Sequence, residues 1–209
     1  MSGWYHHVMR LRVSLSAAAL LLLAGTASAA PCPGSQAQLV GYNNLFTIPA
    51  AVFDTTLTVN GELFGQVALD LVSGTLRFSH PVRQGANWTR VIATDAYDVT
   101  GPPPGTPVSL TAELVVTGEL DSPGCGGSGC GGWFQASITQ GSASAPYQHT
   151  FPNVFAGGTV TCSPTLTLPV TIIAGSPTRV DFELAVFVPA GGNAGGAGRG
   201  SFRFTGLPP

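Results

Sequence analysis

The sequence predicts an all-β protein, an antiparallel β-sandwich of jelly-roll or Greek-key type with about nine or ten strands. Apolar and polar residues alternate with a period of two in many short segments, which is typical of strands with one buried face. Turn residues separate these segments at regular intervals, and no stretch after residue 30 shows sustained helical periodicity. Two packed sheets need strands of this kind.

The alternation identifies the individual strands in chain order. It is clear in 62–72, 74–80, 107–120, 132–139, 177–189 and 200–206, and weaker in 36–43, 55–60, 157–162 and 165–173. The separating turns are Asn60-Gly61, Ser73-Gly74, 101–107, 174–177 and the run "AGGNAGGAGRG" at 190–200. We interpret this last run as a flexible hairpin loop, because a strand pattern resumes after it.

The N-terminus predicts export. Arg10 and Arg12 precede an apolar run at 13–24, and Ala27-Ser28-Ala29 has the small-x-small pattern of a signal-peptidase site. We expect a Sec-type signal peptide over 1–29 and a single β-sandwich domain over 30–209, secreted to the extracellular space or the periplasm. An uncleaved anchor is disfavoured, because a membrane-spanning helix needs about 20 apolar residues. No later segment predicts a membrane span.

Charge is sparse and slightly negative. The chain has no lysine, and the part after residue 29 holds six arginines against ten acidic residues. Nucleic-acid binding needs a basic stripe, so this class of function is excluded.

The four cysteines that follow the leader predict disulfides, because an even number in an exported protein is typical of them. Four cysteines allow three connectivities, and we prefer Cys125–Cys130 with Cys32–Cys162. Glycines between Cys125 and Cys130 allow the tight curl that a short bridge needs. A zinc site is the alternative, but no histidine lies near these cysteines in the sequence.

Several stretches resemble a loose group of bacterial exported β-rich proteins of unknown function. The resemblance lies in 93–120, in 170–188, and in the Ala/Gly run followed by "GSFRFTGLPP" at 200–209. Many members of this group carry a C-terminal sorting tail of the PEP-CTERM type, which is absent here. Either the chain is truncated after Pro208-Pro209, or its last strand closes the fold. The resemblance implies a secreted or surface sandwich and transfers no catalytic residue.

Asp95 and Asp98 are the candidate metal ligands. The alternation places Asp95 on the same face as apolar neighbours, where a carboxylate needs a partner. Calcium is the one cofactor that these two residues suggest. The alternatives are a bulge that turns Asp95 outward, or a hydrogen bond into a turn.

The remaining polar candidates favour no enzyme. Asp181 and Glu183 share a strand face with Arg179, which predicts an exposed ladder of charges, and Glu113 and Glu119 are interpreted in the same way. His80 and His149 are single and are expected at the surface or rim, with no nucleophile motif beside them.

Two hypotheses follow for the function. The first is a non-enzymatic surface, extracellular matrix or adhesion protein that presents loops to other surface proteins. The second is a carbohydrate-binding module for polysaccharide, with Trp133, Trp88 and Tyr147 as a flat stacking platform. These two differ in whether the rings are exposed and coplanar. A glycoside-active enzyme is a third possibility, which requires two acids in one cleft.

Overall fold

The computed structural model describes residues 36–41, 44–48, 52–59, 62–84, 87–122, 132–150, 158–188 and 193–206. This part of the chain forms thirteen strands and no helix. The strands are β1 (Gln36–Gly41), β2 (Asn44–Ile48), β3 (Val52–Val59), β4 (Glu62–Asp70), β5 (Thr75–Gln84), β6 (Asn87–Tyr97), β7 (Pro107–Ser122), β8 (Trp133–Gln140), β9 (Ala143–Thr150), β10 (Gly158–Cys162), β11 (Thr165–Ile173), β12 (Thr178–Val188) and β13 (Asn193–Thr205). These ranges contain no helix that could cross a membrane.

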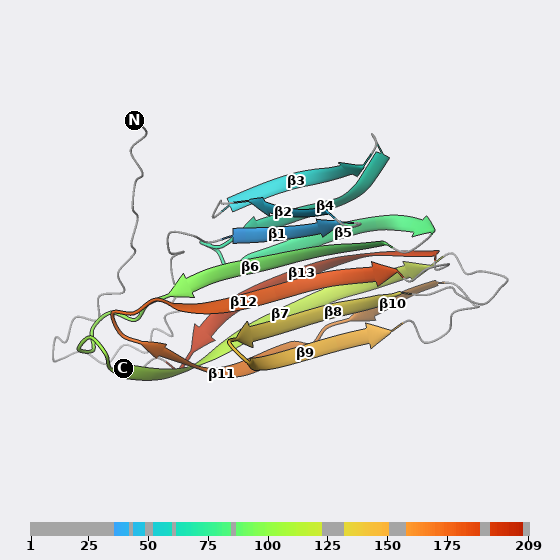
Figure 1. The fold of residues 1–209 in the computed structure, drawn as a ribbon. Coiled ribbons are helices and arrows are strands. Elements are labelled where there is room, and N and C mark those ends of the chain that lie inside the picture. The colour runs from blue at the N-terminus through green and yellow to red at the C-terminus, as the bar shows by residue number, and fades with distance from the viewer. Residues whose placement is uncertain are drawn as a thin grey trace, which may run out of the picture.

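The strands form two antiparallel sheets (Figure 1). The six-stranded sheet has the order β2-β1-β6-β12-β8-β9. The seven-stranded sheet has the order β10-β7-β13-β5-β4-β3, and β11 also pairs with β7. The predicted all-β sandwich is therefore confirmed. Its strands outnumber the expected nine or ten because β2, β6 and β9 are additional.

The core lies between the inner faces of the sheets. On β12, Val180, Phe182, Leu184 and Val186 alternate inward and are fully buried. The Phe182 ring stacks on Phe202 of β13, with ring centroids 4.4 Å apart, and this contact joins the two sheets. Burying an apolar side chain of this size contributes about 1.5–3 kcal/mol to stability. The period-two alternation of the sequence thus gives each sheet its apolar face.

The glycine-rich run corrects the prediction. Residues 193–200 belong to β13, which lies between β7 and β5 in the middle of the seven-stranded sheet, so the predicted flexible loop over 190–200 is wrong for this part. Gly196, Gly198 and Gly200 alternate with Ala197 and Arg199, so the run has strand periodicity with glycine on the inner face.

Polar contacts cover one edge of the sandwich. The side-chain amide of Gln140, at the end of β8, donates to the Thr171 carbonyl on β11 at 2.9 Å and accepts from the Thr171 N–H at 3.2 Å. Pro169 on β11 and Pro146 on β9 lack the N–H that a further strand would pair with. These residues block strand addition at the edges formed by β9 and β11.

The predicted signal peptide over 1–29 and three cysteines, Cys32, Cys125 and Cys130, lie outside the described residues. The leader, its cleavage site and both disulfides stay predictions.

Candidate functional site

A groove of about 620 Å³ crosses the outer face of the seven-stranded sheet. Residues from six strands of this sheet and the segment after β10 line it. They are Asp54, Gln66, Val67, Ala68, Arg77, Phe78, Ser79, Thr117, Gly118, Glu119, Thr161, Cys162, Ser163, Ala197, Gly198 and Arg199. We call this the sheet groove.

Strand pairing builds the floor of the sheet groove as two neighbouring rows. The first row, from β3 across to β7, is Asp54, Ala68, Arg77, Arg199 and Thr117. The second row, from β4 across to β10, is Gln66, Ser79, Ala197, Glu119 and Thr161. Both rows are predominantly polar, as expected for the face that alternates with the apolar one.

Inward-facing glycines account for the hollow. Gly118 on β7 is paired with Gly198 on β13. A Cβ atom at Gly118 would lie 2.5 Å from Cε2 of Phe134, and a Cβ atom at Gly198 would lie 2.5 Å from Cε1 of Phe78. Without side chains at these two positions, the backbone of the seven-stranded sheet lies directly on the aromatic core. The outward side chain of Ala197 is short, which leaves the space above it open.

The charged groups of the sheet groove are weakly paired. Nη2 of Arg77 lies 3.8 Å from Oδ2 of Asp54, beyond hydrogen-bond distance, and the two side chains are 61% and 75% exposed. Among the described residues, no ion pair involves Arg199 or Glu119. The groove therefore presents guanidinium, carboxylate, amide and hydroxyl groups that are available to a ligand.

No local pattern in the sequence indicates this site. Gln66 and Arg77 lie on the consecutive strands β4 and β5, whereas Arg199 lies on β13, far along the chain, and only the pairing of β13 with β5 brings the three together. Glu119 is exposed, as predicted for a solvated acid, and belongs to the floor of the sheet groove. The period-two glycines of the run at 190–200 were the available signal for a close approach of the sheets.

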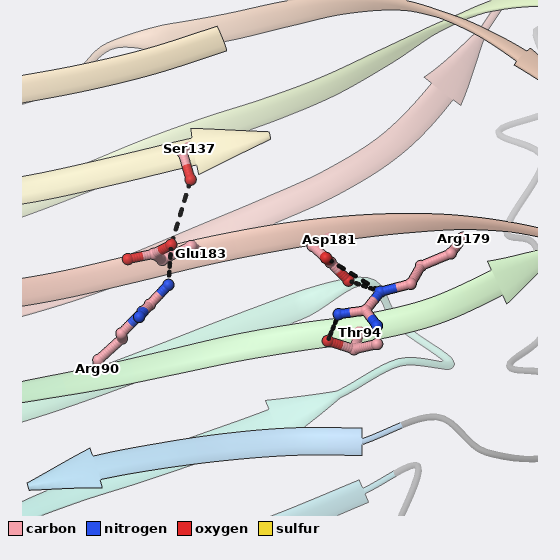
Figure 2. A network of polar contacts seen from close by, with 6 residues as sticks. All are labelled: Arg90, Thr94, Ser137, Arg179, Asp181 and Glu183. Atoms are coloured by element: carbon pink, nitrogen blue, oxygen red, sulfur yellow. Dashed lines mark hydrogen bonds and ion pairs between the residues drawn. The ribbon is translucent and has the colours of Figure 1, made fainter. Parts of the chain in front are cut away.

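The outer face of the six-stranded sheet has the opposite character, and Figure 2 shows its contacts. Arg90 Nη2 donates to Glu183 Oε2 at 2.8 Å, and Ser137 Oγ donates to the same oxygen at 3.4 Å. Arg179 Nε donates to both Asp181 oxygens, at 2.9 and 3.1 Å, and this hydrogen bonding raises the pKa of Arg179. The arginine–carboxylate ladder expected on this strand is present, although Glu183 is buried.

The predicted aromatic platform is not assembled as expected. Register places Trp88, Phe187 and Trp133 in one row across β6, β12 and β8. The rings of Trp133 and Phe187 stack with centroids 4.1 Å apart and planes 24° apart, so they face each other rather than lying coplanar. Tyr147 pairs with Ala136 and packs against the core, on the opposite face of the sheet from Trp133.

The predicted metal ligands serve local structure. Asp95 is 1% exposed on the inner face of β6, and its Oδ1 accepts from the Ala96 N–H at 2.8 Å. Asp98 Oδ1 accepts from the Gly175 N–H at 2.8 Å, so this carboxylate binds the turn after β11. Within the described ranges, no cluster of three or more His, Cys, Asp or Glu residues could hold a metal ion.

The histidine prediction is wrong for His80. This side chain is 2% exposed, and its Nδ1 lies 2.7 Å from the Thr89 hydroxyl oxygen. It occupies an inward position of β5 and not the expected surface or rim. His149 belongs to β9, and its backbone pairs with Phe134.

Cys162 lies at one end of the sheet groove and forms no disulfide with another described residue. Burial raises the pKa of this thiol, and burial also raises the pKa of Tyr147, which is hydrogen-bonded to it. The predicted partner, Cys32, lies outside the described residues, so the Cys32–Cys162 bridge remains untested.

No family model and no curated protein matches the sequence. Among solved structures, the chain is similar to the carbohydrate-binding module TmCBM61, solved with β-1,4-galactotriose, at 10% identity and a TM-score of 0.33, over 82% of this chain and 88% of that chain. It is also similar to the arabinose-bound α-L-arabinofuranosidase MgGH51, at 13% identity and a TM-score of 0.31, over 74% of this chain and 23% of that chain. A cyclase from Fischerella sp. TAU follows at 15% identity and a TM-score of 0.25, over 66% of this chain and 76% of that chain. These similarities concern the β-sandwich architecture and carry no argument about function.

Proposed function

We propose that this protein is an exported, non-enzymatic carbohydrate-binding protein and that the sheet groove holds its ligand. The observation that carries the proposal is the groove itself, a hollow of about 620 Å³ whose floor is built from two predominantly polar rows of side chains. This is the second of the two sequence-based hypotheses, with the site moved from Trp133 to the opposite sheet.

The shape of the sheet groove suits a polymer. Each row crosses five adjacent strands, and the two rows together cross six. Since strands lie about 4.8 Å apart, the floor extends over roughly 24 Å. An extended saccharide chain carries hydroxyl groups along its whole length. The Gln66 amide, the Ser79 and Thr117 hydroxyls and the Glu119 carboxylate offer hydrogen bonds to them.

The spacing of the acids favours binding over hydrolysis. Two carboxylates line the sheet groove, Asp54 on β3 and Glu119 on β7. Four strand-to-strand steps separate them, which corresponds to about 19 Å. Glycosidases that use two carboxylates hold them about 5–9.5 Å apart, so this pair is too widely separated for that reaction.

The proposal is tested by filling the groove. Ala197→Ile adds bulk at the centre of the floor, and Ser201→Ile adds the same side chain at an exposed position of the same strand and face, outside the groove lining. Calorimetry with soluble galactan, xylan and polygalacturonate should show binding by the unmodified protein to at least one of them. We expect Ala197→Ile to weaken that binding at least about tenfold and Ser201→Ile to leave it unchanged. The proposal fails if none of the polysaccharides binds, or if the two variants behave alike.

A further inference from the structure

We propose that the ligand of the sheet groove is an acidic polysaccharide and that Arg77 and Arg199 bind its anionic groups. This inference rests on the proposed function and adds the chemical class of the ligand. The anionic group is a carboxylate, as in uronic acids, or a sulfate ester.

The two arginines form a pair across adjacent strands. Arg77 on β5 is directly opposite Arg199 on β13, and both side chains stand on the outer face. Like charges directly opposite each other on neighbouring strands lower the stability of a sheet. An anion bound between the two guanidinium groups would remove this repulsion, so the position is suited to a negatively charged ligand.

The other arginines with described side chains are already neutralised. Arg90 and Arg179 donate to carboxylates at 2.8 and 2.9 Å, and Arg203 forms an ion pair with Glu113. In contrast, Arg77 lies 3.8 Å from its nearest carboxylate oxygen, and none of the described ion pairs includes Arg199. The two guanidinium groups without a close carboxylate are therefore the two that line the groove.

The geometry of guanidinium suits this ligand. Its planar fork of N–H donors binds a carboxylate or a sulfate through two parallel hydrogen bonds, which a lysine cannot do. Thr117 lies beside Arg199 in the same row and offers a hydroxyl to the adjoining sugar.

The acids of the sheet groove narrow the class of polymer. Asp54 and Glu119 lie on either side of the arginine pair, on β3 and β7. They would repel a polymer with a negative charge on every unit, such as a nucleic acid. The net charge of the whole chain, −2, acts in the same direction. They accept hydrogen bonds from hydroxyl groups, so a polymer with both hydroxyls and separate acid groups fits the two kinds of side chain.

The test compares charged and neutral polysaccharides on the intact exported protein. Binding to polygalacturonate, dextran sulfate and neutral galactan is measured by calorimetry in 20 and 500 mM NaCl. We expect polygalacturonate or dextran sulfate to bind at least about tenfold more tightly than galactan in low salt, and the difference to shrink in high salt. The first two polymers distinguish a carboxylate ligand from a sulfate ligand.

Arg199→Gln should abolish most of the preference for charged over neutral polysaccharide, whereas Arg203→Gln should keep that preference. Arg203 lies on the same strand and face, and its ion pair with Glu113 is outside the groove lining, so the control removes an equal charge. Arg199→Lys should retain only part of the affinity, because lysine keeps the charge and loses the fork. Thermal unfolding of each variant confirms that it is folded.

Equal binding of galactan and the charged polymers, unaffected by Arg199→Gln, would overturn this inference and leave the proposed function intact. An equal loss in Arg203→Gln would also overturn it, because the preference would then come from overall charge. Absence of binding to every polysaccharide would remove the proposed function together with this inference.

Discussion

The two outer faces of the sandwich use the same residue types in opposite ways. On the six-stranded sheet, Arg90 and Glu183 lie 2.8 Å apart with side chains 31% and 12% exposed. On the seven-stranded sheet, Arg77 and Asp54 lie 3.8 Å apart with side chains 61% and 75% exposed. Arginine and carboxylate pair closely on the first face. On the second face the Arg203–Glu113 pair is also close, but the charged groups that line the sheet groove remain available. Composition alone therefore says little about the role of a charged residue.

The two outer faces differ because the inner faces of the two sheets carry side chains of different size. Beneath the sheet groove, Gly118 and Gly198 face the core, and Phe134 from the other sheet fills the space that their side chains leave. The six-stranded sheet carries Phe182 and Leu184 inward at its centre. At these two glycine positions the seven-stranded sheet has no inward side chain, so its backbone lies closer to the other sheet. The outer surface is therefore lower at this place, and the long side chains around it extend into solvent.

The largest expected effect is on the free energy of unfolding, and it tests whether the inward glycines allow the close approach that forms the groove. Gly198→Val would place side-chain atoms into Phe78 and Phe134, because even a Cβ atom would lie 2.5 Å from the first ring and 2.7 Å from the second. We expect it to lower the free energy of unfolding by about 3 kcal/mol or more, as measured by urea denaturation. Ser201→Val, at an exposed position of the same strand, should change it by less than about 0.5 kcal/mol. Equal stability of the two variants would refute the close approach of the sheets at Gly198.

An intermediate effect compares the two faces directly. Glu183→Gln should lower the free energy of unfolding by about 1–3 kcal/mol, because it removes the charge that the part-buried Arg90 pairs with. Asp54→Asn removes a largely exposed partner of Arg77 and should change the free energy of unfolding by less than about 0.5 kcal/mol. Urea denaturation of both variants at neutral pH measures the difference. Similar values for the two would contradict the contrast between the faces.

The smallest effect concerns a carboxylate of the seven-stranded sheet that is paired with backbone. Asp70 Oδ1 accepts from the N–H groups of Val72 at 2.9 Å and Ser73 at 3.0 Å, in the turn between β4 and β5. The Ser73 hydrogen bond, above all, lowers the pKa of Asp70 below its ordinary value of 3.8. The stabilisation from the ionised group is therefore present above pH 3.8 and is lost as the pH falls through the lower folded-state value.

Asp70→Ala should accordingly reduce the free energy of unfolding at pH 7 by at most about 1 kcal/mol. The reduction should shrink when urea denaturation is repeated at pH 2. A reduction of the same size at both pH values would show that the charge of Asp70 does not contribute.

Alternation in the sequence was sufficient to predict the sandwich. It identified the inward faces of β7 and β12, because those segments place large apolar residues at every second position. It also identified the second part of β13, predicted over 200–206, but failed in the first part, where the inward positions 196 and 198 are glycine and the alternation has no apolar member. The position of His80 was also missed, since a buried polar group depends on a partner such as Thr89 on another strand.

The sheet groove could not be predicted from the sequence in the same way. Its arginine pair needs β13 to lie against β5, and this pairing joins residues from distant parts of the chain. Nothing in the local sequence around Arg77 or Arg199 specifies that neighbour. The aromatic residues, which are the usual sequence signal for sugar binding, predict a site on the six-stranded sheet instead.

The central place of β13 governs the order in which the molecule can fold. Every other strand of the described chain precedes β13, yet it separates β7 from β5 in the finished sheet. Before β13 pairs with them, β5 and β7 have unpaired backbone groups along the edges that face each other in the finished sheet, next to apolar side chains. Such contacts between distant segments form slowly, and exposed edges of this kind invite aggregation. The seven-stranded sheet is therefore completed only when the last strand of the described chain pairs with both of these neighbours.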